Sequence, residues 1–306
     1  MEKFKIVELS REEKDSLEQL GTKAKFWFFD KKTKKLFKQG RPDTGEDWAE
    51  VVVSKICEEL DIPHAKYEFA KYQNMEGTIT ESFVPQEGRL VLGNELLATI
   101  LKNIEYDTLK KYGLREYKLS TVLAILKSDV INVPIGYKNK FITSAFDVFV
   151  GYIMLDCLIS NPDRHHENWG LIVSEGSVYL SPTYDHASGL GCREPLERKR
   201  KRLISKDEGF KVKSFVKRAK TPFYDRNDGK KLTTLESVIL CSIHNKKATM
   251  YWLKKLENLD IEKVRKIFHK IPNGLIREIS IEFAIEMLKV NRDRLLAGLE
   301  VLSNEK

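Results

Sequence analysis

Cysteines are few in this sequence and long apolar runs are missing, and both scarcities limit what the protein can be. The 306 residues include four cysteines, and no two of them form a C-x-x-C pair. Scattered cysteines argue against a disulfide framework and against a zinc site. No stretch approaches the roughly 18 apolar residues of a membrane-spanning helix, and the start, MEKFKIVELSREEK, lacks the apolar core of a secretory signal. We therefore expect a cytoplasmic protein without a membrane span.

The composition is typical of a globular protein with a large core. Apolar residues make up 42% of the chain and charged residues 32%, and the length allows one large domain or two lobes. The net charge of +8 is concentrated in residues 190–220, which carry 12 Lys/Arg against 4 Asp/Glu, an excess equal to the whole net charge. Because the basicity is local, we do not predict a nucleic-acid partner.

Short apolar and aromatic runs in the first part of the chain predict strands around one helix. In the helix, Trp48, Val51, Val52 and Ile56 recur at helical spacing. Thr44 with Asp47 three residues later predicts a capping box at its start. The expected order is strand, strand, helix, strand and strand, at residues 24–30, 35–40, 46–60, 66–73 and 77–84.

The polar stretch PQEGR (85–89) is a candidate hinge, and the pattern becomes helical after it. Residues 141–160 show apolar repeats at helical spacing, WGLIV and VYLSPTYD predict a short hairpin, and residues 232–305 read mostly as helix. We therefore predict two lobes, a β-rich N-lobe over 1–88 and a helical C-lobe over 89–306.

A dense polar cluster, PDRHHEN, interrupts the apolar sequence after the helix at 141–160. Within it, Asp163 and Asn168 are five residues apart on one predicted loop. A carboxylate that accepts a hydroxyl proton and an amide oxygen that binds Mg²⁺ are the groups that phosphoryl transfer needs. Asp185, at the end of a strand and followed by a glycine turn, would be a second oxygen ligand for Mg²⁺.

Three features upstream of the hinge fit the same chemistry. Lys38 ends an apolar strand, where it can contact the phosphates of a nucleotide, and Glu50 on the next helix can pair with it. Gly21 lies in a turn before the first strand of the expected hairpin, which suits a loop that covers phosphates. Each feature alone is a weak signal, whereas their order along the chain is that of a two-lobed kinase.

The segments NPDRHHENWGL and LSPTYDHASGLG resemble the catalytic and metal-binding segments of HipA-type Ser/Thr kinases. These kinases have a DRHxxN motif in place of HRD and lack DFG. The segment from LFKQG to KYEFA is similar to the N-lobe of the compact CtkA-like and HipT-like members. The resemblance covers most of residues 20–190. It implies an α+β, two-lobed protein-kinase-like fold with a small β-rich N-lobe and a larger helical C-lobe.

The resemblance also implies a role for each matching residue. Asp163 would be the catalytic base, with Asn168 and Asp185 as the other catalytic and Mg²⁺-binding residues. Lys38 would contact ATP, with Glu50 as its partner. The remaining ATP-binding positions would be the phosphate loop from Gly21 through Thr22 to Lys25, and the hinge positions Glu81 and Phe83.

The basic run RKRKR (198–202) has three interpretations: a solvated loop, a substrate-docking or activation segment, or a nucleic-acid contact. Its position after Asp185 is where kinases place their activation segment. Because residues 191–222 are rich in like charges and poor in large apolar side chains, we expect this segment to be mobile.

The sequence as a whole favours an ATP- and Mg²⁺-dependent kinase that acts on Ser/Thr of a protein. Two alternatives stay open: a kinase for a lipid or small molecule, and a catalytically silent binding module of toxin–antitoxin type. The long HipA toxins have an additional N-terminal subdomain that is absent ahead of the kinase-like segments here. A small antitoxin-like partner chain could supply it.

Overall fold

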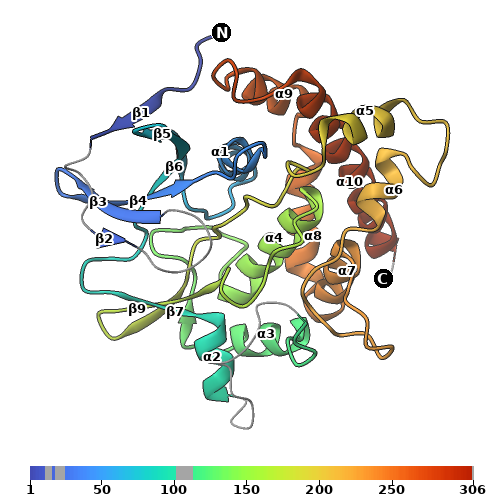
Figure 1. Ribbon diagram of the computed structural model, residues 1–306. Coiled ribbons are helices and arrows are strands. Elements are labelled where there is room, and N and C mark those ends of the chain that lie inside the picture. Colours follow the sequence, from blue (N-terminus) through green and yellow to red (C-terminus); the bar gives the residue numbers. More distant parts are fainter. Residues whose placement is uncertain (11–15, 18–24, 101–112, 305–306) are drawn as a thin grey trace.

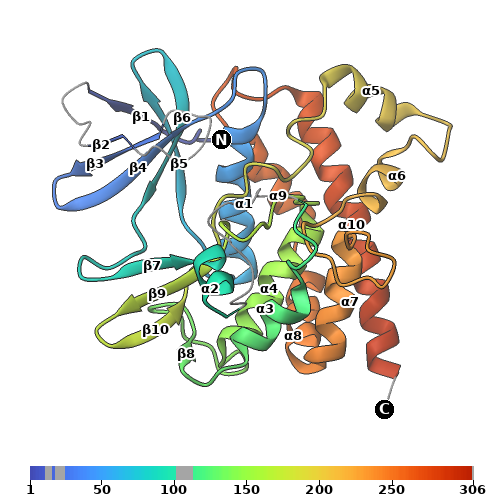
Figure 2. The ribbon, with the colours of Figure 1, turned by 60° about the horizontal axis from the view of Figure 1, so that its bottom comes forward.

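The computed structural model describes residues 1–10, 16–17, 25–100 and 113–304. They form a β-rich N-terminal lobe and a larger helical lobe (Figures 1 and 2). The strands of the first lobe are β1 (Ile6–Leu9), β2 (Ser16–Leu17), β3 (Lys25–Asp30), β4 (Thr33–Gln39), β5 (Tyr67–Tyr72) and β6 (Met75–Glu81). The helix α1 (Glu46–Leu60) connects β4 to β5.

The N-terminal strands form one sheet in the order β1-β5-β6-β4-β3-β2. The hairpin predicted from the aromatic run is present as β3 and β4, which pair antiparallel with Lys25 opposite Lys38. Successive side chains of a strand point to opposite faces. Phe26 and Phe28 are accordingly buried in a small core with Phe37, while Phe29 is exposed.

The helix predicted over residues 46–60 is α1, with the same bounds. The predicted capping box is wrong. Gly45 is the N-cap and no side chain caps the first turn, because Thr44 belongs to the preceding turn and its hydroxyl donates to the carbonyl of Arg41 at 2.7 Å. The helix ends at Asp61, whose left-handed backbone (φ 58°) directs its N–H back to the last carbonyls.

The strand β7 (Arg89–Leu92) comes directly after the lobe boundary predicted between residues 88 and 89, and that boundary stays a prediction. This strand belongs to a second sheet, in the order β7-β9-β10-β8. The hairpin expected from WGLIV and VYLSPTYD is the antiparallel pair of β9 and β10 in this sheet. The other strands of the sheet are β8 (Ile131–Asn132), β9 (Gly170–Ser174) and β10 (Ser177–Leu180).

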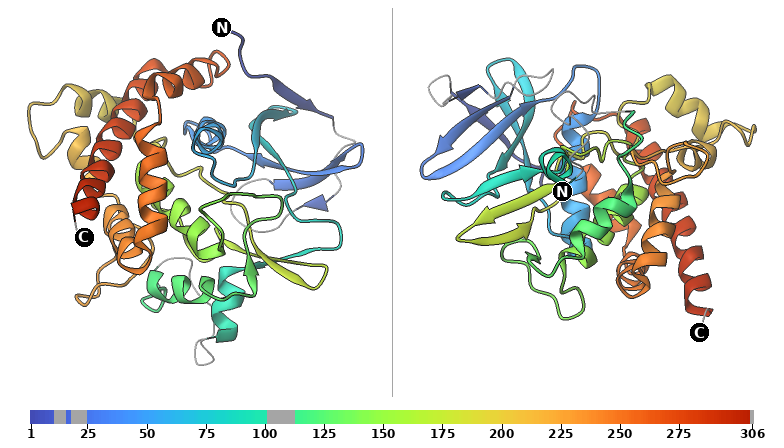
Figure 3. Two further views of the ribbon diagram at one scale, coloured as in Figure 1. Left: turned by 180° about the vertical axis from the view of Figure 1, so that it is seen from behind. Right: turned by 90° about the horizontal axis from the view of Figure 1, so that it is seen from below.

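Helices make up most of the second lobe. In chain order they are α2 (Gly93–Ile100), α3 (Leu119–Leu126), α4 (Ala145–Leu158), α5 (Leu196–Ile204), α6 (Val212–Lys217), α7 (Thr234–His244), α8 (Lys246–Glu257), α9 (Ile261–His269) and α10 (Glu278–Asn304). Figure 3 shows α5, α6, α7, α8 and α10, from yellow to red, on the side of the molecule away from the N-terminal sheet. Within the described part of the chain, no helix combines the length and apolarity that a bilayer crossing requires.

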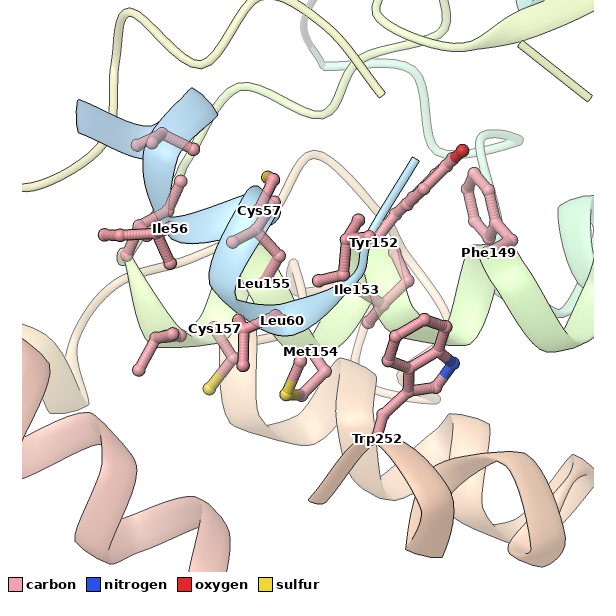
Figure 4. Close-up of a cluster of buried hydrophobic side chains, with 14 of the residues drawn as sticks. Ile56, Cys57, Leu60, Phe149, Tyr152, Ile153, Met154, Leu155, Cys157 and Trp252 are labelled. Atoms are coloured by element: carbon pink, nitrogen blue, oxygen red, sulfur yellow. The ribbon is translucent and has the colours of Figure 1, made fainter. Parts of the chain in front are cut away.

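The helix α4 lies at the centre of the core, which explains its apolar sequence on every side. It starts with a capping box formed by Ser144 and Asp147, and the residues from Ala145 to Leu158 are buried except Asp147. Figure 4 shows side chains of α1 and α4 meeting next to Trp252 of α8. Because α1 shares this core, the N-terminal lobe is anchored to the C-terminal lobe.

The prediction that residues 191–222 are mobile is contradicted, because the segment forms α5 and α6, which pack against α10. Its basic side chains are not all solvated. Lys199 is only 2% exposed, and the Arg202 guanidinium lies 4.5 Å from the centre of the Phe210 ring while pairing with Glu194. Long basic side chains bury their apolar stems, and composition alone underestimates that contribution.

Candidate active site

A pocket of about 440 Å³ lies between the two lobes. It collects most of the predicted nucleotide-site residues from β3, β4, β6, the loop before β9 and the segment after β10. The predicted residues that line it are Lys25, Lys38, Glu81, Phe83, Asn168 and Asp185. Glu50 and Asp163 reach it through contacts with Lys38 and with Asn168. Gly21 and Thr22 lie outside the described residues.

Lys38 is the hub of a buried charge cluster. Its Nζ lies 2.7 Å from Glu50 Oε1 and 2.5 Å from Asp185 Oδ1, so one cation joins β4, α1 and the segment after β10. Burial alone would lower the pKa of Lys38, but the carboxylates of Asp185 and Glu50 outweigh it and hold that pKa well above its ordinary value. The lysine is therefore a permanent cation in the pocket.

Glu50 is held from a second side. It is 1% exposed, and its Oε2 accepts the backbone N–H of His186 at 2.8 Å. Burial raises the pKa of Glu50, while Lys38 and this N–H oppose the shift. Asp185 itself has a left-handed backbone (φ 57°) and donates its N–H to the hydroxyl of Tyr67 at 3.3 Å. The segment that carries Asp185 is thus fixed to α1 and to β5.

The loop after α4 brings Asp163 and Asn168 together, as their spacing predicts. The Asn168 amide nitrogen donates to the Asp163 carbonyl at 2.7 Å, and the Asp163 N–H donates to Asn161 Oδ1 at 3.1 Å. Because its nitrogen is engaged, Asn168 presents its amide oxygen as the end that can bind a cation. His165 completes the loop, with Nε2 3.8 Å from Asp163 Oδ1.

Arg164, in the polar cluster, forms a buried ion pair with the apolar helix that precedes it. It is 1% exposed and forms a bidentate pair with Asp156, with Nε–Oδ2 at 2.7 Å and Nη2–Oδ1 at 2.8 Å. Its Nη1 donates to the Asn168 carbonyl at 2.8 Å. Burial would lower the pKa of Arg164, but the Asp156 carboxylate raises it. The guanidinium therefore fastens the loop to α4.

Two residues of this arrangement were missed by the sequence analysis. Asp156 was treated as part of an apolar helix, although a lone carboxylate in such a run signals a buried cation nearby. Ser188 was treated as part of a glycine turn. Its hydroxyl donates to Asp163 Oδ2 at 2.9 Å, and the residue is 9% exposed. Nothing in the local sequence connects Ser188 with a residue 25 positions earlier.

The wall of the pocket near the hinge is flat and apolar. The rings of Phe83 and Tyr184 are stacked with centroids 5.4 Å apart, and Leu36, Leu90 and Leu92 also line the pocket. The Tyr184 hydroxyl donates to the Glu167 carbonyl at 2.9 Å, which holds the ring in place. An apolar slot of this shape accommodates a planar aromatic group such as a nucleobase.

Comparisons with known proteins identify the fold. No family model and no curated protein matches the sequence significantly. Among solved structures, the Helicobacter pylori proinflammatory kinase CtkA matches with a TM-score of 0.76 and 18% identity, over 99% of this chain and 100% of that one. HipA of Shewanella oneidensis MR-1, in its complex with HipB and operator DNA, matches with a TM-score of 0.59 and 11% identity, over 95% of this chain and 67% of that one.

Identities this low establish the fold and nothing finer. The α+β, two-lobed protein-kinase-like fold predicted from the sequence is therefore confirmed. CtkA and HipA are both named in the family resemblance drawn from the sequence. Residues of the two segments that carry this resemblance, Asn168 and Asp185, line one pocket.

Proposed function

We propose that the protein is a HipA-like, ATP-dependent kinase that transfers the γ-phosphoryl group to Ser or Thr of a protein. The observation that carries this proposal is the convergence of two groups of side chains on one pocket. Lys38, Glu50 and Asp185 form the cation–carboxylate cluster, and Asn168 with Asp163 forms the loop opposite. Phosphoryl transfer requires a positioned nucleotide, a metal site and a base. In this proposal the first group positions the nucleotide and, with Asn168, the metal, and Asp163 is the base.

The residues fit a nucleotide with Mg²⁺. Asn168 and Asp185 offer an amide and a carboxylate oxygen, the hard donors that Mg²⁺ prefers. Lys38 would contact the phosphates, and the slot beside Phe83 would take the base, with Glu81 at the hinge. Lys25, at the start of β3, would meet the phosphates from above. When bound, the metal neutralises charge on the transferring group.

Asp163 is the proposed base. Its Oδ2 accepts the Ser188 hydroxyl at 2.9 Å, and its main-chain carbonyl accepts the Asn168 amide at 2.7 Å. These two bonds hold the carboxylate while it takes the proton of the acceptor hydroxyl, whose oxygen then attacks phosphorus. Arg164 supports the loop from beneath through Asp156. We propose that the base is positioned before the acceptor binds.

A purified-protein assay tests the proposal. The chain is incubated with radiolabelled ATP and Mg²⁺ in the presence of cell lysate, lipid vesicles or small-molecule acceptors, and products are identified by mass spectrometry. Label on Ser/Thr of proteins supports the proposal. Label on lipid or a small molecule would identify the other kinase class, and the absence of label and of ATP turnover would identify a silent module. A small antitoxin-like partner would appear as a copurifying chain.

The metal requirement is a prediction of its own. Because the proposed ligands are oxygens only, we expect activity with Mg²⁺ or Mn²⁺ and little with Zn²⁺. Asp185→Asn should raise the Mg²⁺ concentration needed for half-maximal activity at least about tenfold, because the variant loses a charged, direct oxygen ligand and even outer-shell substitutions cost about tenfold. Titration of activity against Mg²⁺ measures this. A variant with the wild-type Mg²⁺ requirement would show that Asp185 is not a ligand.

Ser188 provides a second prediction. Ser188→Ala should lower the turnover number about tenfold with little change in the KM for ATP, because the variant loses a bond to the proposed base and no contact to nucleotide. Ser188→Thr keeps the hydroxyl and should restore most of the rate. Steady-state kinetics of the three proteins measure this, and equal rates for Ser188→Ala and wild type would contradict the positioning role.

A further inference from the structure

A second and larger pocket, of about 640 Å³, lies at the N-terminal end of α1. Its walls come from four separate parts of the chain: residues 39–48 before and at the start of α1, residues 74–76 at the turn into β6, residues 192–199 leading into α5, and residues 274–280 before α10. The loop into α1 and the helix α5 both lie at the top of Figure 2. None of its lining residues belongs to the nucleotide pocket.

Lys199 is the unusual residue of this pocket. It is 2% exposed, and its Nζ contacts only neutral groups: the Cys192 carbonyl at 3.3 Å, the Ser280 hydroxyl at 3.1 Å and the Trp48 ring at 5.7 Å from its centre. Among the described residues, no carboxylate lies within ion-pair distance of it. An ammonium carries three donors, so the two hydrogen bonds leave one N–H for a ligand.

A buried ammonium without a counter-ion is costly, because desolvation is not offset by an opposite charge. Burial accordingly lowers the pKa of Lys199, and Glu194, beyond ion-pair distance, opposes the shift only in part. Such a residue is stabilised when an anion enters the pocket that it lines. A buried charge beside the pocket shows the contrast: Glu46, 2% exposed, is paired with Arg193 at 2.7 Å and with Arg41 at 3.4 Å.

The remaining charges of the pocket leave room for an anion. Glu194 is neutralised by Arg198 at 3.1 Å and Arg202 at 2.7 Å. The Asp47 carboxylate packs against the backbone of Gly40. A Cβ atom at Gly40 would lie 1.9 Å from Asp47 Oδ1. The other two carboxylates, Asp43 and Glu76, are exposed to solvent, so water screens them.

Two further features of the same pocket favour an oxyanion. The helix α1 begins there with Gly45 as its N-cap and without a side-chain cap. Its first turn carries Glu46, which Arg41 and Arg193 pair, and Asp47, while its N-terminal N–H groups attract negative charge. Arg277 stands on the wall before α10, exposed and without an ion-pair partner among the described residues. Lys199, Arg277 and the start of α1 thus approach one space from three sides.

We propose that this pocket binds a phosphoryl group, carried by a phosphorylated side chain or by a free phosphate compound. Donors on three sides suit the three terminal oxygens of a phosphoryl group better than the two of a carboxylate. The site lies at the first turn of α1, and the same helix carries Glu50 one turn later. Occupancy of the pocket would therefore brace the helix that holds the partner of Lys38.

Binding of inorganic phosphate to the full chain tests the proposal without any assay of catalysis. Isothermal titration and thermal melting are done at constant ionic strength, with KCl replaced by phosphate. The wild type should bind phosphate and melt at a higher temperature with it. Lys199→Met should weaken binding at least tenfold, and in phosphate-free buffer it should melt no lower than the wild type, because it removes a buried uncompensated charge.

Two control variants, a second variant of the site and a competing peptide separate this site from the rest of the molecule. Lys201→Met, an exposed lysine on the same helix, and Lys254→Met, an exposed lysine of α8, should change phosphate affinity less than twofold. Arg277→Gln, at an exposed position, should fold normally and weaken binding severalfold. A phosphoserine peptide that competes with phosphate in the wild type points to a phosphorylated protein, and phosphate binding alone points to a small molecule.

The proposal is overturned if the wild type does not respond to phosphate. It is also overturned if Lys199→Met keeps the wild-type affinity, or if that variant melts well below the wild type without phosphate while Arg277→Gln binds normally. In the last case Lys199 is a structural residue that joins α5 to α10. None of these outcomes depends on whether the chain transfers phosphate from ATP.

Discussion

An Asp163→Asn variant should lose about 10³-fold in phosphoryl-transfer rate and keep its fold and its affinity for ATP. Asparagine has the same shape, so the bond from the Ser188 hydroxyl at 2.9 Å can still form with the amide oxygen. The main-chain bonds to Asn161 and Asn168 do not involve the side chain that changes. What disappears is the negative charge that takes the acceptor proton.

Single-turnover kinetics with labelled ATP and a nucleotide-binding titration measure the two effects separately. Asp129→Asn is a suitable control, because that carboxylate is exposed and lies on a different loop. Near-wild-type turnover in Asp163→Asn would show that Asp163 is not the base. A loss of ATP affinity as large as the loss of rate would assign the residue to nucleotide binding instead.

Local spacing was enough to predict the elements and part of the site. The recurrence of Trp48, Val51, Val52 and Ile56 gave the bounds of α1, because a helix that packs on a core must repeat its apolar side chains. The five-residue spacing of Asp163 and Asn168 gave their contact, because both sit on one short loop. The roles assigned to these residues stay predictions.

The parts that could not be predicted depend on contacts between distant segments. Ser188 meets Asp163 across 25 residues, and Arg164 is buried because Asp156 lies in the preceding helix. The ordered structure of residues 191–222 depends on the packing of α5 and α6 against α10, which lies far along the chain. Repulsion between the like charges of α5 can be seen in the local sequence and disfavours a compact helix. Burial of the apolar stems of Lys199 and Arg202 stabilises the helix more than this repulsion destabilises it.

The Lys38–Glu50 contact could be predicted from the sequence only in part. The sequence placed a lysine on a strand and a glutamate on the next helix, 12 residues apart, and several other lysines and glutamates competed for the same roles. The structure selects Lys38 and Glu50 by their ion pair, in which Nζ and Oε1 are 2.7 Å apart. It also adds Asp185 as a second partner of the lysine, 147 residues away. The ATP-binding role of the lysine is still a proposal.

Lys38→Met should destabilise the protein by about 3–5 kcal/mol at pH 8, because it leaves the buried Glu50 carboxylate without its counter-charge. Asp185, about one third exposed, keeps some solvation and adds less. Lys35→Met on the same strand is a matched control. Its ion pair with Asp30 is also 2.7 Å long, but Asp30 is half exposed, so the loss should be below about 1 kcal/mol.

The deficit of Lys38→Met should shrink as the pH falls from 8 to 5. Burial already raises the pKa of Glu50 above its ordinary value in the wild type. Glu50 therefore binds a proton more tightly in the folded protein than in the unfolded chain. The contribution of Glu50 to the free energy of unfolding falls as the pH rises through its folded pKa. Without Lys38 the pKa of Glu50 rises further, and protonation at low pH removes the unpaired charge.

Adding Glu50→Gln to Lys38→Met isolates this effect. Glutamine keeps an oxygen for the His186 N–H, which donates at 2.8 Å in the wild type, and carries no charge. The double variant should recover about 2 kcal/mol at pH 8 and lose most of its pH dependence between 5 and 8. Denaturant unfolding at the two pH values measures both. If the double variant is no more stable than Lys38→Met at pH 8, the buried carboxylate is not the source of the cost, and the lysine stabilises the lobe through its packing alone.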